Sequence, residues 1–144
     1  MTTRIAIGQI GHFHPLLVHF PIALILTAAA AESAAIVWPM HPWHVVGVIN
    51  VRAGAAFSAV TAIAGWLFVS SAAIDLTPLL EWHRWIGIAG AVISSAAALL
   101  SSTRSDRSPR SVGAYRLALF AAALLVGIAG HLGGTLVWGT PFQP

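Results

Sequence analysis

The sequence contains no cysteine and no lysine, and it has only four acidic side chains among 144 residues. Without cysteine there are no disulfides, no iron–sulfur ligands and no thioether attachment of c-type haem, so histidine, methionine or oxygen must hold any metal. Charged residues make up 8% of the chain and hydrophobic residues 58%, which is typical of a polytopic membrane protein with little soluble material. The seven arginines form no basic stripe, so nucleic-acid binding is not expected.

Four apolar runs, each long enough to cross a bilayer, predict an all-α integral membrane protein. We expect helices over residues of about 13–37, 48–71, 79–102 and 115–138. They would form one transmembrane domain, residues 1–144, folded as an up-down-up-down four-helix bundle in the lipid bilayer. Pro21 lies inside the first run and should bend that helix or loosen its first turns.

The arginines predict the orientation of the bundle. The side with the first and third connections carries five of them, namely Arg52, Arg104, Arg107, Arg110 and Arg116. The other side has only Arg4 and Arg84. By the positive-inside rule both termini should face the outer, periplasmic side of a bacterial cytoplasmic (inner) membrane.

Two polar features lie toward the predicted cytoplasmic side. Glu32, deep in the first helix, is predicted to form an ion pair with Arg52 at the start of the second. His41 and His44 stand in a turn rich in proline and tryptophan. Such a pair is most often only part of an exposed turn, although its spacing also permits a second metal site.

Four histidines should lie at one depth near the outer side. His14 and His19 are in the first turns of helix one, His83 is in the first turns of helix three, and His131 is about 10 Å before the end of helix four. Ionisable residues inside a membrane are functional candidates by default, although histidines near helix ends also cap, snorkel or join helices. His14 and His19 point about 140° apart, so they are not expected to bind one metal together.

Glycines flank His131 on the same helical face, with Gly127 at i−4 and Gly134 at i+3. This trough suits either the close approach of another helix or a flat macrocycle whose metal the imidazole holds. Gly87 lies at i+4 from His83 in the same way. A zinc site would usually recruit a carboxylate, a thiolate or three clustered histidines. The pattern of separated histidines beside small residues therefore suits haem better than zinc.

Three motifs resemble those of a bacterial membrane-protein family described only as a domain of unknown function. They are HPLLVHFP at residues 14–21, HRW at 83–85 and GHLGGTLVWG at 130–139. Members of that family are often associated with c-type cytochromes. The resemblance implies a redox setting, with one or two haem b groups held at His14, His19, His83 and His131. Trp138 stands where the family pattern has tyrosine, so no hydroxyl acts at that position.

Two functions follow from these expectations. The first is a haem b-binding membrane cytochrome that relays electrons on the outer side of the membrane, as an electron-transfer subunit rather than a stand-alone enzyme. It would link quinol, or a larger respiratory or photosynthetic complex, to a c-type cytochrome, with Arg84 holding the haem propionates. The second is a non-catalytic accessory subunit whose histidines only join helices.

Overall fold

The computed structural model describes residue 11 and residues 13–71, 76–101 and 108–139, and all regular structure in these ranges is helical. Arg4, Arg104 and Arg107 lie outside the described residues. The elements are α2 (His14–Leu17), α3 (His19–Val37), α4 (Trp43–Ser71), α5 (Pro78–Leu100) and α6 (Pro109–Trp138). With α2 and α3 taken together, four spans of 23 to 30 residues are apolar and long enough to cross a membrane. The prediction of an all-α, four-span protein is confirmed.

Two helices begin earlier than predicted. α4 begins at Trp43 rather than residue 48, and α6 begins at Pro109 rather than residue 115. At α6 the reason is local, because the Ser108 hydroxyl accepts a hydrogen bond from the backbone N–H of Ser111 at 3.2 Å. Proline follows at the first helical position, where no backbone N–H is needed. This capping signal extends the helix into a segment whose hydropathy alone predicts a loop.

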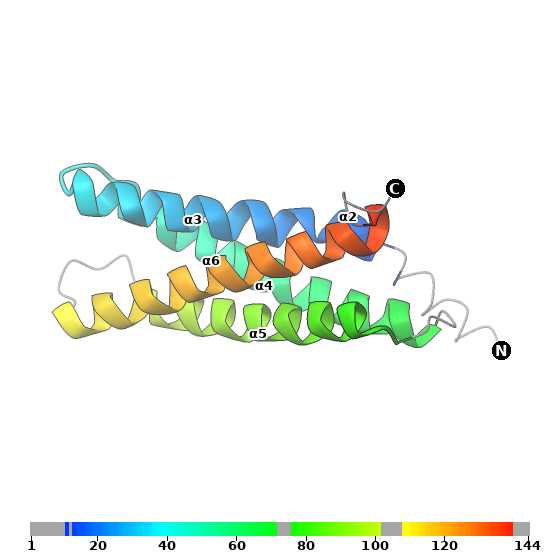
Figure 1. Ribbon diagram of the computed structural model, residues 1–144. Helices are drawn as coiled ribbons and strands as arrows, with labels where there is room; N and C mark the ends of the chain where they lie inside the picture. Colours follow the sequence, from blue (N-terminus) through cyan, green and yellow to red (C-terminus); the bar gives the residue numbers. More distant parts are fainter. Residues whose placement is uncertain (1–10, 12, 72–75, 102–107, 140–144) are drawn as a thin grey trace.

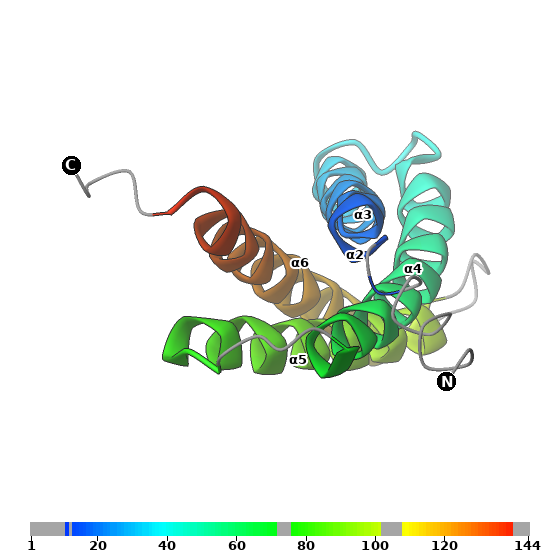
Figure 2. The ribbon, with the colours of Figure 1, turned by 90° about the vertical axis from the view of Figure 1, so that its right-hand side faces the viewer.

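The spans form an antiparallel bundle in which each packs against two neighbours. α3 packs against α4, α4 against α5, α5 against α6, and α6 returns to α3. The start of α2, the start of α5 and the end of α6 lie at one end of the bundle (Figure 1), which we call the histidine end. The opposite end, where α3 finishes and α6 begins, we call the glutamate end. Figure 2 looks along the bundle from the histidine end.

Small residues set the distances between the helices. A Cβ atom on Gly54 of α4 would lie only 2.6 Å from Cδ1 of Ile25, so glycine lets α3 approach closely there. Ile22 of the same helix packs against Gly130 of α6 in the same manner, at 2.9 Å. Lipid tails are as apolar as the core, so close van der Waals packing of this kind, rather than the hydrophobic effect, holds the helices together. The buried centre consists of Ile25, Ala28, Val51, Ala97, Tyr115, Leu119 and Ala122.

The first span is interrupted where Pro21 was expected to disturb it. Proline has no backbone N–H, so the carbonyl of Leu17, four residues earlier, lacks its usual helical donor. The hydroxyl of Thr61 on α4 donates to that carbonyl at 3.3 Å. Thr61 is buried. A backbone acceptor left open by proline is thus satisfied from the neighbouring helix, as a membrane interior requires.

The Thr61 hydroxyl can be tested by an isosteric change. Thr61→Val should lower the free energy of unfolding in mild detergent by about 1 kcal/mol, because the Leu17 carbonyl then has no donor in an apolar setting. Thr27→Val, on the exposed face of α3, is the matched control and should leave the midpoint of thermal unfolding unchanged. Equal midpoints for the two variants would show that the hydroxyl does not stabilise the kink.

Candidate functional site

Two of the predicted ligands meet inside the bundle at the histidine end. His14 of α2 and His83 of α5 are both half-buried. Their ring centroids lie 6.1 Å apart, with the ring planes at 77°. The two residues are 69 positions apart in the sequence, so the contact joins the first half of the bundle to the second.

Each imidazole is oriented by a backbone carbonyl of a neighbouring helix. The Nδ1–H of His14 donates to the carbonyl oxygen of Thr61 on α4 at 3.0 Å. The Nδ1–H of His83 donates to the carbonyl oxygen of Ala129 on α6 at 2.9 Å. A carbonyl oxygen only accepts, so Nδ1 carries the proton in each ring and Nε2 of the neutral imidazole keeps its lone pair. This is the arrangement typical of a metal-binding histidine, whose other nitrogen donates to a carbonyl or carboxylate.

Within the described residues, neither Nε2 atom takes part in a hydrogen bond. Two basic nitrogens are therefore available in a partly buried position. Because a lone pair in an apolar setting is costly when it has no partner, the pair favours a ligand over simple packing.

A glycine lies one turn after each acceptor carbonyl. A Cβ on Gly65, four residues after Thr61, would come within 2.7 Å of Cε1 of His14. A Cβ on Gly133, four residues after Ala129, would come within 3.0 Å of Cε1 of His83. An acceptor carbonyl followed four residues later by a glycine against the imidazole thus occurs twice, on α4 and on α6. The sequence analysis missed both glycines as partners of histidine, since the pairing depends on which helices are neighbours.

The other two predicted ligands lie outside this pair. His19 is exposed, and its Nδ1 bonds within its own helical turn to the carbonyl of Leu16 at 3.3 Å. His131 is also exposed. The three glycines expected to border a cofactor, Gly87, Gly127 and Gly134, have nothing within 4 Å of the position of an added Cβ. The structure therefore brings His14 and His83 together and leaves His19 and His131 on the surface.

Arg84, predicted to bind propionates, lies beside the pair in sequence and over the ring of Trp66 in space. Its guanidinium carbon is 4.3 Å from that ring's centre. The two side chains border a shallow hollow of about 270 Å³ on α4 and α5. Among the described residues, no carboxylate forms an ion pair with Arg84, so its charge is available to an anionic group.

No group of three or more histidine or acidic side chains gathers within the described residues in a way that could hold a metal ion by itself. The site consists of two imidazoles. The two ring centres lie 6.1 Å apart, and the Nε2 atom of each ring forms no hydrogen bond within the described residues. This donor set fits a metal that brings most of its ligands with it better than a bare ion held by protein side chains alone.

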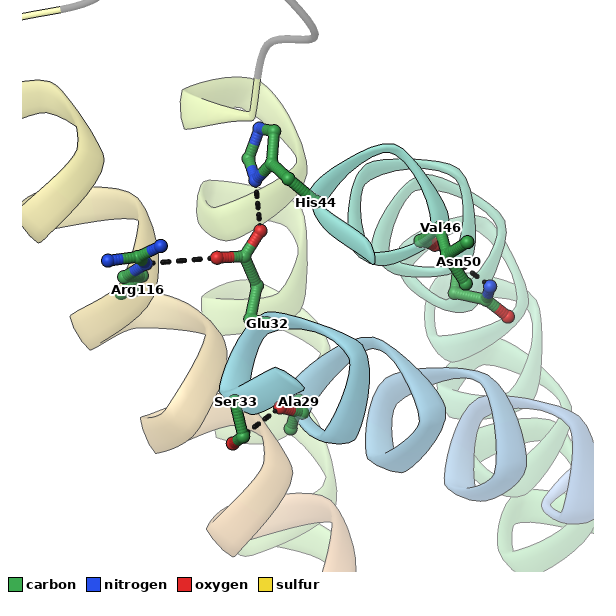
Figure 3. A network of polar contacts seen from close by, with 7 residues as sticks. All are labelled: Ala29, Glu32, Ser33, His44, Val46, Asn50 and Arg116. Carbon is green, nitrogen blue, oxygen red and sulfur yellow. Dashed lines mark hydrogen bonds and ion pairs between the residues drawn. The ribbon is translucent and has the colours of Figure 1, made fainter. Parts of the chain in front are cut away.

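A second polar cluster lies at the glutamate end, and it corrects one prediction. Glu32 pairs with Arg116 of α6, whose Nε donates to Oε2 at 2.9 Å, and not with Arg52 (Figure 3). His44 of α4 contacts the other carboxylate oxygen. Arg52 instead donates to the hydroxyl and carbonyl of Ser101 on α5, both at 3.0 Å. The predicted pairing of Glu32 with Arg52 is thus wrong, and the contact between the first two spans is made by His44.

The sequence could not show which arginine pairs with Glu32, because both lie at a similar depth in the bundle. Arg52 and Arg116 both stand about two to two and a half turns from the glutamate end of their helices, and only the rotation of each helix decides which one faces Glu32. Glu32 is fully buried, at 0% exposure, and a carboxylate in that position requires a charged or hydrogen-bonding partner. His44, expected in an exposed turn, is instead in the first turn of α4 and half-buried.

Comparison with known families agrees with the motifs in the sequence. The chain belongs to the predicted membrane protein family DUF2231, whose family model matches residues 12–142. No curated protein and no solved structure matches the chain significantly. Family membership and the four apolar spans together establish a multi-pass membrane protein.

The ion pair at the glutamate end gives a direct test of the corrected partner. Glu32→Leu should lower the free energy of unfolding by roughly 1–3 kcal/mol, because it leaves the half-buried Arg116 without its acceptor. The double variant Glu32→Leu/Arg116→Leu should recover much of that loss. Glu32→Leu/Arg52→Leu is the matched control and should recover none. If stability recovered in Glu32→Leu/Arg52→Leu and not in Glu32→Leu/Arg116→Leu, Arg52 would be the partner of Glu32.

Proposed function

We propose that this membrane protein is a small b-type cytochrome that relays electrons at the histidine end of the bundle. His14 and His83 would hold the iron of one haem b. The observation that carries the proposal is the pair of imidazoles, 6.1 Å apart, whose Nδ1–H groups are both held by backbone carbonyls while both Nε2 lone pairs remain free.

The number of protein ligands favours a macrocycle over a bare ion. A structural zinc ion is almost always held by four protein ligands and a catalytic one by three. The described residues supply two. A porphyrin supplies four equatorial nitrogens of its own, so two histidines complete its iron. When bound, the haem would supply the one-electron chemistry, and the protein would tune it through ligands, charge and dielectric.

The protein's own residues would position and insulate the cofactor. The carbonyls of Thr61 and Ala129 fix the tautomer and orientation of both rings. His14 is tied to α4 and His83 to α6, so a flat group between the rings would lie along the boundary between the first two spans and the last two. Arg84 is placed one residue from His83 to bind a carboxylate at the bilayer surface.

The distribution of arginines predicts which end of the bundle faces the cytoplasm. Arg52, Arg110 and Arg116 stand at or near the glutamate end, and Arg84 is at the histidine end. The positive-inside rule then places the glutamate end in the cytoplasm of a bacterial inner membrane and the haem on the outer side. One haem at one side does not carry electrons across the bilayer. We therefore expect exchange with an external c-type cytochrome or a larger redox complex, with quinol as a possible donor.

A second candidate function is an accessory subunit in which the histidines only join helices. The observation that favours it is the pair of interhelical hydrogen bonds themselves, since each ring already links two spans. The visible spectrum of the purified protein separates the two functions. Reduced bis-histidine haem gives sharp, split α and β bands, and a protein without cofactor gives none.

The ligand pair is tested by four alanine variants. His14→Ala and His83→Ala should each remove most of the haem measured by the pyridine haemochrome assay, because one axial ligand is lost. His131→Ala and His41→Ala, at exposed positions, should retain it. Loss of haem in the His131 variant with retention in the His14 variant would show that His131, on the surface of α6, is a ligand. It would overturn the pairing of His14 with His83.

The orientation is tested by reporter fusions. An alkaline phosphatase fused after Gln143 should be active, since the enzyme needs the oxidising exterior to form its disulfides. The same reporter inserted between Ser105 and Arg110 should be inactive. The opposite pattern would place the histidine end in the cytoplasm and exclude an external redox partner.

A further inference from the structure

The first turns of α5 carry two opposite charges that do not pair with each other. Glu81 and Arg84 stand three residues apart, which places their Cβ atoms about 5–6 Å from each other on one face of the helix. Within the described residues, neither side chain forms an ion pair. Each charge is therefore available to a partner from outside the chain.

Tryptophans place these two charges at the level of the lipid headgroups. Counted from Pro78 at 1.5 Å per residue, Glu81 and Arg84 lie about 5 Å and 9 Å inside the span. Trp82 and Trp85, which lie beside them on α5, are 65% and 64% exposed. Tryptophans of membrane spans gather where the headgroups meet the acyl chains. A molecule that pairs with both charges at this depth therefore has a polar head and an apolar body.

Arg84 borders a hollow that suits a phosphate ester. The hollow has a volume of about 270 Å³, and its described lining consists of Trp66, Val69, Ser70, Leu76 and Arg84. The guanidinium is the only charged group among these residues, and its N–H donors match two phosphate oxygens at once. The rest of the lining is mostly apolar, which suits the hydrocarbon that adjoins the phosphate of a lipid.

Glu81 borders a second hollow, which suits a cation. This hollow has a volume of about 310 Å³, and its described lining consists of Glu81, Trp82 and Trp85. Indole rings attract an ammonium group through the negative faces of their π-systems. A carboxylate adds the opposite charge, and it accepts hydrogen bonds from the N–H groups of a primary ammonium. No arginine lies among the described residues that line this hollow.

We propose that the two hollows bind the headgroup of one phospholipid of the ethanolamine class. Arg84 would bind its phosphate, and Glu81, Trp82 and Trp85 would bind its ammonium. In this headgroup a short ethylene linker joins the phosphate to the ammonium, so the two charges lie about as close together as Glu81 and Arg84 do on one helical turn. The order of the charges is also complementary, because each hollow meets the charge of opposite sign.

Other lipid headgroups leave one of the two hollows poorly used. Phosphatidylglycerol has a phosphate for Arg84 but no cation for Glu81. Phosphatidylcholine has a quaternary ammonium, which can face the tryptophan rings but has no N–H group to donate to the carboxylate. The described lining of neither hollow includes His14 or His83, so the lipid site stands or falls separately from the haem. A guanidinium has five N–H donors, so a phosphate along one edge leaves donors for a carboxylate.

Lipid binding to the purified protein tests the proposal. Native mass spectrometry in detergent measures dissociation constants for phosphatidylethanolamine, phosphatidylcholine and phosphatidylglycerol with identical acyl chains. The ethanolamine lipid should bind about threefold to tenfold more tightly than the other two, since only its ammonium both donates to Glu81 and faces the rings. Equal constants for the three lipids would overturn the proposal. An excess of glycerophosphoethanolamine, which has the headgroup without acyl chains, should not displace the lipid, and displacement would assign the hollows to a soluble ligand instead.

Charge variants test each hollow separately. Glu81→Gln should abolish the preference for the ethanolamine lipid over phosphatidylglycerol. Arg84→Gln should weaken the binding of all three lipids by about threefold or more, because they share the phosphate. Arg110→Gln, at an exposed position of the glutamate end, is the matched control and should change neither quantity. A preference that survives Glu81→Gln, or lipid binding that is unchanged in Arg84→Gln, would exclude these hollows as the site.

Discussion

The buried carboxylate of Glu32 is the constraint around which the bundle is arranged. A charge with no exposed surface inside a membrane span is tolerated only when its partners are fixed, and here they come from two other spans. Arg116 and His44 bring α6 and α4 to α3 at the same depth. The ion pair therefore determines which helices are neighbours at the glutamate end. The glycine contacts then determine how closely they approach along the rest of their length.

The polar ties between the two halves of the bundle lie near its two ends. At the glutamate end they are the pair of Glu32 with Arg116 and the bonds from Arg52 to Ser101. At the histidine end they are the contact between the rings of His14 and His83 and the stacking of the Arg84 guanidinium over the ring of Trp66. The histidine end is thus joined by contacts between aromatic rings and between a guanidinium and a ring. The glutamate end is therefore the end at which an ion pair and hydrogen bonds join the two halves of the bundle.

Hydropathy was sufficient to predict the four spans, and the position of Pro21 was sufficient to predict the break in the first. The grouping at one end of the bundle of the helix ends that carry the four histidines also followed from helix order. What the sequence did not reveal was which histidines face inward. In a soluble bundle the apolar stripe marks the buried face, but here every face is apolar, since lipid covers the outside. His14 and His19 are therefore indistinguishable by periodicity, and so are Arg52 and Arg116 as partners of Glu32.

The acceptors that orient His14 and His83 belong to the main chain. No substitution at Thr61 or Ala129 removes a carbonyl oxygen. The position of the proton on Nδ1 of both rings is therefore set by the backbone of α4 and α6 and not by a side chain. The positions that can obstruct them are Gly65 and Gly133, where any side chain would collide with an imidazole. A side chain at either glycine would therefore displace an imidazole, whereas a new side chain at Thr61 or Ala129 leaves the acceptor oxygen in the main chain.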